Sequence, residues 1–94
     1  MIEHVEDVGP VLTKSVIADA VVAAIFDLNP DARLLDRGSY VRVSAAGRCE
    51  LTREAVEAHL GAPFELPSGL ESVMISFTGE LTVSEHGALW VAKT

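Results

Sequence analysis

The sequence predicts an α+β fold, a single compact domain in which a mostly antiparallel sheet carries two main helices packed on it. Two observations support this class. Several short segments alternate apolar and polar residues, as strands with one buried face do, and two longer segments show helical apolar spacing bounded by capping residues. The order is strand, helix, strands, helix and then three strands, and the regular elements are close together along the chain.

The first part of the chain predicts a strand followed by a helix. Residues 1–7 are predicted to be a flexible acidic tail ahead of a domain spanning residues 8–94. Residues 8–14 are rich in β-formers, and Pro10, which has no amide hydrogen, indicates an edge strand. Ser15 is a candidate N-cap for a helix over residues 16–28, and Asn29-Pro30 should end that helix.

The middle of the chain predicts a β-hairpin that runs into a second helix. A short strand is expected over residues 32–35. Tyr40, Arg42 and Ser44 alternate with apolar residues, Gly47 can form a tight turn, and residues 48–51 return as the partner strand. Thr52 is the candidate N-cap of the second helix, which Gly61 should end.

The last third of the chain predicts a loop over residues 65–69 and then three strands, over residues 72–77, 80–84 and 88–92. In the first of these strands, alternation puts Ile75 and Phe77 on one face, where they either pack in the core or meet a partner. Ser76 and Thr78 should then lie on the opposite, solvent-exposed face.

The charge distribution is uneven. The chain has a net charge of −7, which argues against a nucleic-acid ligand, because phosphate binding needs a basic surface. Residues 1–31 carry a net −5, residues 32–53 a net +3 and residues 54–94 a net −5. The five arginines of the middle segment form either a solvated strand face or a basic patch that orients docking on a protein partner: Arg33, Arg37, Arg42, Arg48 and Arg53.

The composition also bears on location. No apolar run approaches the roughly 20 residues that a membrane-spanning helix needs. The first residues are acidic, where a signal peptide would be basic. A single cysteine, Cys49, cannot form an internal disulfide. The sequence therefore predicts a cytoplasmic protein without a membrane partner.

The residues that carry chemistry form no recognisable catalytic or metal-binding motif. No glutamate has a histidine three residues later, the spacing that a carboxylate-bridged diiron site uses on a helix, and the glycines are isolated rather than gathered in a phosphate-binding loop. His59 is interpreted as a helix residue, His86 as a turn residue and Cys49 as a small packed side chain. The prediction is therefore no catalytic, cofactor-binding or metal-binding residue.

The stretch from Tyr40 to Phe64 carries a family resemblance: YVRVSAAGRCELTREAVEAHLGAPF. Together with Val8-Gly9-Pro10 and Ser76-Phe77-Thr78-Gly79, it resembles the effector (coupling or regulatory) proteins of soluble diiron multicomponent monooxygenases. These are the small components of the phenol, toluene, alkene and methane systems. Only seven residues precede Val8, whereas methane-type members carry a long N-terminal extension, so the chain looks closer to the aromatic- and alkene-oxidising branches.

The resemblance implies a non-catalytic regulatory subunit. Such a subunit docks on the diiron hydroxylase and tunes substrate and oxygen access, turnover and coupling, and it acts beside a reductase and often a ferredoxin. It implies no cofactor on this chain, since the diiron centre, flavin and iron–sulfur cluster belong to the partner components.

The resemblance also implies which residues touch the hydroxylase. The segment expected at the hydroxylase surface is Ile75, Ser76, Phe77, Thr78 and Gly79, and the matching positions near the start are Val8, Gly9 and Pro10.

Two other functions stay open from the sequence alone. One is a small ligand-binding α+β module with a cavity under the sheet, which would need converging polar groups. The other is a stand-alone enzyme that uses an acid–base pair such as His59 with Glu57.

Overall fold

The computed structural model describes residues 6–93. Its ten elements run in the order expected for an α+β domain, and every strand pair is antiparallel. The strands form two sheets rather than one. The four-stranded sheet has the order β2-β3-β1-β5 and the three-stranded sheet the order β4-β7-β6.

The four-stranded sheet contains β1 (Asp7–Thr13), β2 (Arg33–Asp36), β3 (Tyr40–Ala46) and β5 (Met74–Thr78). The three-stranded sheet contains β4 (Arg48–Thr52), β6 (Glu80–Val83) and β7 (Gly87–Val91). The predicted tail falls mostly outside the described residues, and Asp7 is the first residue of β1.

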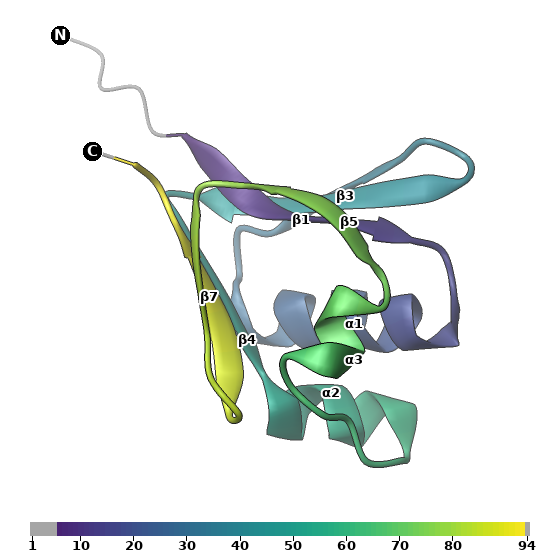
Figure 1. Ribbon diagram of the computed structural model, residues 1–94. Coiled ribbons are helices and arrows are strands. Elements are labelled where there is room, and N and C mark those ends of the chain that lie inside the picture. Colours follow the sequence, from purple (N-terminus) through teal and green to yellow (C-terminus); the bar gives the residue numbers. More distant parts are fainter. Residues whose placement is uncertain (1–5, 94) are drawn as a thin grey trace, which may run out of the picture.

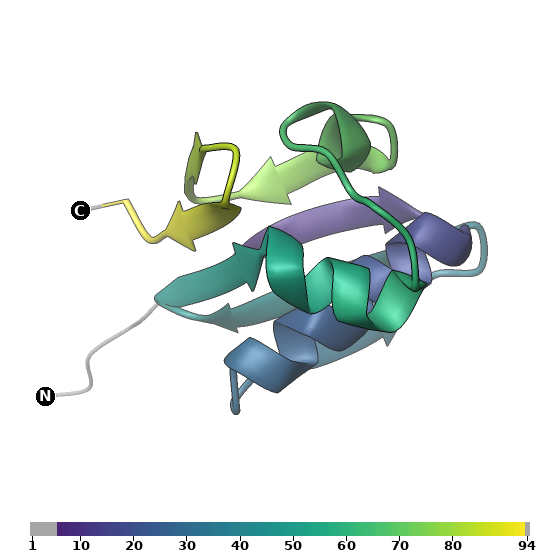
Figure 2. The same ribbon diagram turned by 90° about the horizontal axis from the view of Figure 1, so that it is seen from below.

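Helices cover one side of the four-stranded sheet. The helices are α1 (Val16–Leu28), α2 (Arg53–Leu60) and the single turn α3 (Ser68–Glu71). Both ribbon views place α1 and α2 on the same side of the sheet (Figures 1 and 2), and no described element covers its other side. The core between these layers includes Leu12 of β1, Ile25 of α1 and Trp90 of β7, each fully buried.

Both predicted helix caps are confirmed. The Ser15 hydroxyl accepts a hydrogen bond from the amide of Ala18 at 3.0 Å, and the Thr52 hydroxyl accepts one from the amide of Ala55 at 3.2 Å. These bonds satisfy amides that have no partner inside the first helical turn. Gly61 ends α2 in the left-handed conformation.

Asn29 joins α1 to the second sheet. Its buried side-chain amide donates to the carbonyl oxygens of Ile25 and Glu50, each at 2.8 Å, and its Oδ1 accepts from the Glu50 amide at 2.9 Å. A buried backbone group that loses its partner costs about 1–3 kcal/mol, so these contacts hold the end of α1 against β4.

The predicted hairpin between residues 40 and 51 is wrong. The two strands exist, but β3 pairs with β1 and β2, whereas β4 pairs with β7. Only Gly47 lies between them, and a hairpin needs at least two connecting residues. The chain instead turns a corner there. The Gly47 amide donates to the carbonyl of Glu6, and the Gly47 carbonyl accepts from the amide of Ala92.

The prediction that Pro10 marks an edge strand is also wrong, because β1 lies between β3 and β5. The β1–β3 ladder has no paired residue at Gly9 or Pro10, so the missing proline amide interrupts no bond there. The predicted loop at residues 65–69 runs into α3, whose Leu70 is fully buried.

Replacing Thr52 with alanine should lower the free energy of unfolding by about 0.5–2 kcal/mol, because the first turn of α2 loses its side-chain acceptor. Urea denaturation measures this change. Ser68→Ala, which removes an exposed hydroxyl from α3, is the control. A loss below about 0.3 kcal/mol for Thr52→Ala would show that the cap adds little to stability.

Candidate docking surface

The two segments predicted to contact the hydroxylase lie side by side. Gly9 of β1 pairs with Thr78 of β5, and Pro10 pairs with Phe77. More than 60 residues separate the partners along the chain, and antiparallel pairing brings them together. The predicted site residues therefore form one continuous piece of sheet.

Burial divides the predicted site residues into two groups. Val8, Gly9 and Pro10 are buried, so the side chains of Val8 and Pro10 pack inside the molecule. Ile75 and Phe77 are 59% and 40% exposed, and Ser76 is exposed beside them. The exposed part of the predicted site is therefore β5.

Of the two positions considered for Ile75 and Phe77, the core and the docking surface, the core is wrong, because both side chains are exposed. β5 is an edge strand, and the pairing of β1 with β5 shifts register between Val11 and Leu12. The shift disturbs simple alternation, and Ile75 lines the same surface hollow as Ser76. The edge position leaves Phe77 partly in solvent.

Gly79 ends this segment where the backbone passes close to other strands. A Cβ atom at Gly79 would lie 2.7 Å from Cγ1 of Val8 and 2.8 Å from the carbonyl oxygen of Val91, and its φ is +96°. A larger residue would therefore collide with β1 and β7. Gly79 sets the path of the chain from β5 into β6.

Two hollows lie on the uncovered side of the four-stranded sheet. The first measures about 390 Å³ and the second about 310 Å³. Leu35 and Arg42 line both of them, so the two hollows adjoin. We call this surface the outer sheet face, and it includes Val11, Arg33, Leu35, Arg37, Tyr40, Arg42, Ser44, Ile75, Ser76 and Thr78.

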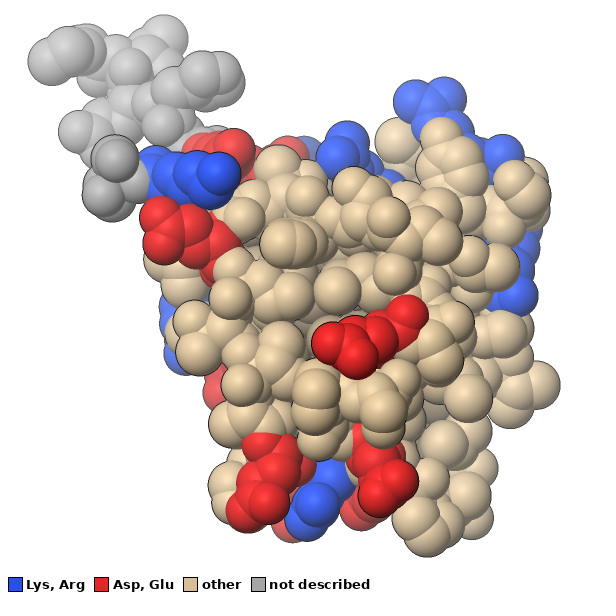
Figure 3. All heavy atoms as spheres, viewed as in Figure 1, with Lys and Arg blue, Asp and Glu red and all other residues tan. Residues whose placement is uncertain are grey.

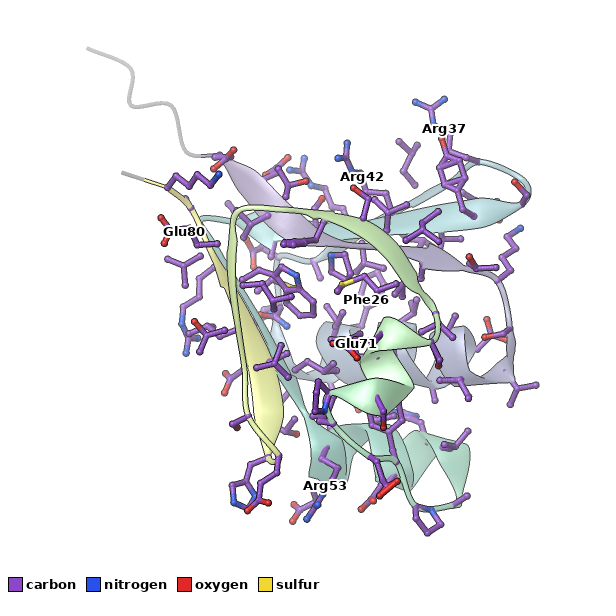
Figure 4. The ribbon with its side chains drawn as sticks, in the orientation of Figure 1. Phe26, Arg37, Arg42, Arg53, Glu71 and Glu80 are labelled. Carbon is purple, nitrogen blue, oxygen red and sulfur yellow. The ribbon has the colours of Figure 1, made fainter. Side chains whose placement is uncertain are left out.

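Three of the five arginines of residues 32–53 belong to the outer sheet face, namely Arg33, Arg37 and Arg42. Figure 4 shows Arg37 and Arg42 extending from the sheet away from the helices, whereas Arg53 lies at the opposite end of the molecule. In the space-filling view, basic side chains gather along the upper right border, whereas along the lower border acidic side chains lie on both sides of a basic one (Figure 3). Arg33, Arg37 and Arg42 therefore share one face of the sheet, and Arg48 and Arg53 lie elsewhere.

Arg42 contacts the predicted docking segment. Its Nη2 donates a hydrogen bond to Oγ1 of Thr78 at 3.0 Å, across the width of β1. Arg42 is not among the residues that the family resemblance implies at the hydroxylase surface, although it is one of the five arginines of the middle segment. The pattern that could have indicated it is the alternation of Tyr40, Arg42 and Ser44, which puts all three on one strand face.

The histidine–glutamate pair considered for an enzyme does not form. His59 Nε2 lies 2.5 Å from Oδ2 of Asp27, whereas the carboxylate of Glu57 accepts a hydrogen bond from the amide of Phe64. Residues two apart on a helix point in different directions, so Glu57 and His59 cannot act as one pair. Among residues 6–93, no group of three or more histidine, cysteine, aspartate or glutamate side chains is placed to hold a metal ion.

Two titratable side chains in the described part of the chain, those of Cys49 and Asp36, have shifted pKa values. Burial, assisted by the charge of Asp31, raises the pKa of the Cys49 thiol to about 12, so this thiol stays protonated at neutral pH. The hydrogen bond from Lys14, with a second from the amide of Gly38, lowers the pKa of Asp36. Asp36 therefore favours the folded state at neutral pH, and this effect disappears as the pH falls through its lowered pKa.

The fold and the open sheet face define a small α+β interaction domain. The sequence model of the MmoB/DmpM family matches residues 6–91. The chain therefore belongs to the MmoB/DmpM family, and the resemblance found in the sequence is confirmed. None of the described helices is both long and apolar enough to cross a membrane.

A relative agrees with this assignment, and solved structures share the fold. The chain is 37% identical over 89 residues to the effector subunit of the alkene monooxygenase system of Xanthobacter autotrophicus, covering 93% of this chain and 87% of the relative. Two chains from structures of phenol hydroxylase–regulatory protein complexes share the fold. One has a TM-score of 0.84 at 20% identity, with 94% of this chain and all of that chain covered. The other has a TM-score of 0.78 at 22% identity, with 92% and 99% covered.

Cys49 should resist alkylation in the folded protein. Iodoacetamide at about pH 8 reacts with thiolates, and a buried thiol with a raised pKa supplies almost none. The measurement is the mass increase of native protein against that of the urea-unfolded chain, which should be fully labelled. Native labelling at the rate of the unfolded chain would show that Cys49 is accessible.

Proposed function

We propose that this chain is the non-catalytic effector subunit of a multicomponent monooxygenase, and that it docks on a diiron hydroxylase that oxidises an aromatic compound or an alkene. Family membership and the likeness to an effector subunit support this proposal. Docking would tune substrate and oxygen access to the hydroxylase, and with it turnover and coupling.

One observation supports the proposal most strongly. The two segments predicted to contact the hydroxylase, residues 8–10 and 75–79, lie side by side next to an open sheet face. β5 exposes Ile75 and Phe77, and large apolar side chains in solvent are typical of surfaces that bind other proteins. Val8, Gly9 and Pro10 are buried and contribute indirectly, because the pairing of β1 with β5 fixes the position of β5. The proposed contacts are therefore made by Ile75, Ser76, Phe77 and Thr78, while Gly79 holds the turn that follows.

The proposal divides the chemistry among components. The hydroxylase would hold the diiron centre, and a reductase, with or without a ferredoxin, would supply electrons through flavin and iron–sulfur groups. This chain would contribute residues 8–94 as an effector domain without a cofactor. A cytoplasmic location is part of the proposal, and the unpaired, buried Cys49 is compatible with a reducing compartment.

The alternative of a ligand cavity under the sheet receives no support from the described core. The space between the sheets and the helices is filled by buried side chains, among them Leu12, Leu51 and Trp90. The hollows found on the sheet lie on its outer side.

The isolated protein should not oxidise a hydrocarbon but should stimulate oxidation by its cognate hydroxylase and reductase, saturating at about one effector per active site. Product formation measured during effector titration tests this. Hydroxylation by the isolated protein, or an unchanged rate in the complete system, would contradict the proposed function.

Ser76→Trp should raise the effector concentration that gives half-maximal turnover by about tenfold or more, because a bulky side chain on β5 would separate the two surfaces. Ala58→Trp, at an exposed position of α2, is the matched control and should leave that concentration unchanged. Thermal melts of both free variants should match the parent. Equal titrations for Ser76→Trp and Ala58→Trp would remove β5 from the interface.

A further inference from the structure

Arg42 occupies the centre of the outer sheet face. It extends from β3, lines both hollows and donates a hydrogen bond to Thr78 at 3.0 Å. A guanidinium carries five N–H donors in a planar fork. The Thr78 contact uses one of them, and the exposed position of Arg42 leaves others facing solvent.

Arg42 and Arg37 have no ionic partner on this chain within residues 6–93. The ion pairs of the described residues include Arg33 with Asp7 at 2.6 Å and Lys14 with Asp36 at 2.8 Å, but none that involves Arg37 or Arg42. These two arginines are unpaired on a protein whose net charge is −7. In such an acidic chain, two uncompensated guanidinium groups on one open face point to an acceptor outside the molecule.

We infer that Arg42 is a docking residue, and that it binds a carboxylate on the hydroxylase surface while it holds the Thr78 hydroxyl in place. This inference rests on the proposed function and adds to it the chemistry of the partner surface, an apolar area with acidic side chains. Arg37 lines one of the same hollows and lies farther out than Arg42 (Figure 4), so it supplies a second, more peripheral cation.

Two features of the outer sheet face favour a protein surface as the occupant. Exposed apolar side chains surround the arginines, notably Leu35, Tyr40 and Ile75. The face is also continuous with the proposed docking segment, because Arg42 contacts Thr78 directly. A guanidinium that is desolvated among apolar groups can bind a carboxylate through two parallel hydrogen bonds, which fixes orientation as well as affinity.

The test is titration of hydroxylase turnover with effector variants at low and at moderate salt. Arg42→Gln should raise the half-saturating concentration by about tenfold or more, because a carboxylate on the partner loses its cation. Arg42→Lys should fall between Arg42→Gln and the parent, since an ammonium group keeps the charge but not the planar fork. Arg37→Gln should give a smaller increase than Arg42→Gln.

Arg53→Gln is the matched control, because it makes the same charge change on α2 at the opposite end of the molecule (Figure 4). It should shift the half-saturating concentration by less than about twofold. The parent should need more effector as salt rises, and Arg42→Gln should show a weaker salt dependence. Thermal melts verify that the variants are folded, and Arg42→Lys and Arg37→Gln keep the test decisive if Arg42→Gln does not fold.

The outcomes separate this inference from the proposed function. If the parent does not stimulate the hydroxylase, the proposed function fails. If the parent stimulates but Arg42→Gln titrates like the parent or like Arg53→Gln, only the role of Arg42 fails. Sedimentation of the free proteins tests whether the outer sheet face binds a second copy of this chain instead of the hydroxylase. A parent dimer that Arg42→Gln dissociates, together with unchanged titration, would overturn the inference in favour of self-association.

Discussion

The close approach of β1 to β3 at Gly9 is the constraint on which the arrangement of the four-stranded sheet depends. A Cβ atom at this position would lie 2.2 Å from the carbonyl oxygen of Val43, and φ is +147°, so only glycine fits. Gly9 lets one edge of β1 lie close to β3, and the other edge of β1 pairs with β5. The strand that carries Thr78 is thereby placed within reach of Arg42 on β3. A local backbone requirement thus determines which side chains share the outer sheet face.

Local features of the fold could be predicted from the sequence, and the pairing of strands could not. Ser15 and Thr52 cap helices where their positions relative to the apolar pattern predicted, because capping involves residues only three apart. The hairpin at Gly47 failed because β4 finds its partner in β7, far along the chain. Asn29 was predicted only as a helix end. Its bonds to Glu50 depend on how α1 packs against β4, which no local pattern reports.

The candidate docking surface was predictable to a similar extent. The family resemblance predicted β5 and the start of β1 as docking segments, and the charge distribution indicated a candidate basic patch. These two signals come from separate parts of the sequence. Their connection is the Arg42–Thr78 hydrogen bond, between residues 36 positions apart, which exists only because β1 lies between β3 and β5. The exposure of Ile75 and Phe77 follows from the edge position of β5, and alternation alone could not decide whether they pack in the core or face a partner.

We propose that the outer sheet face binds the hydroxylase, and hydroxyl-radical footprinting of the effector with and without hydroxylase is the measurement that decides this. Tyr40 and Ile75 are exposed on this face, and Phe26 of α1 is an exposed aromatic residue on the helix-covered side of the sheet. We predict that the hydroxylase protects Tyr40 and Ile75 from oxidation and leaves Phe26 reactive. Protection of Phe26 with unchanged oxidation of Tyr40 and Ile75 would show that the effector docks through its helices.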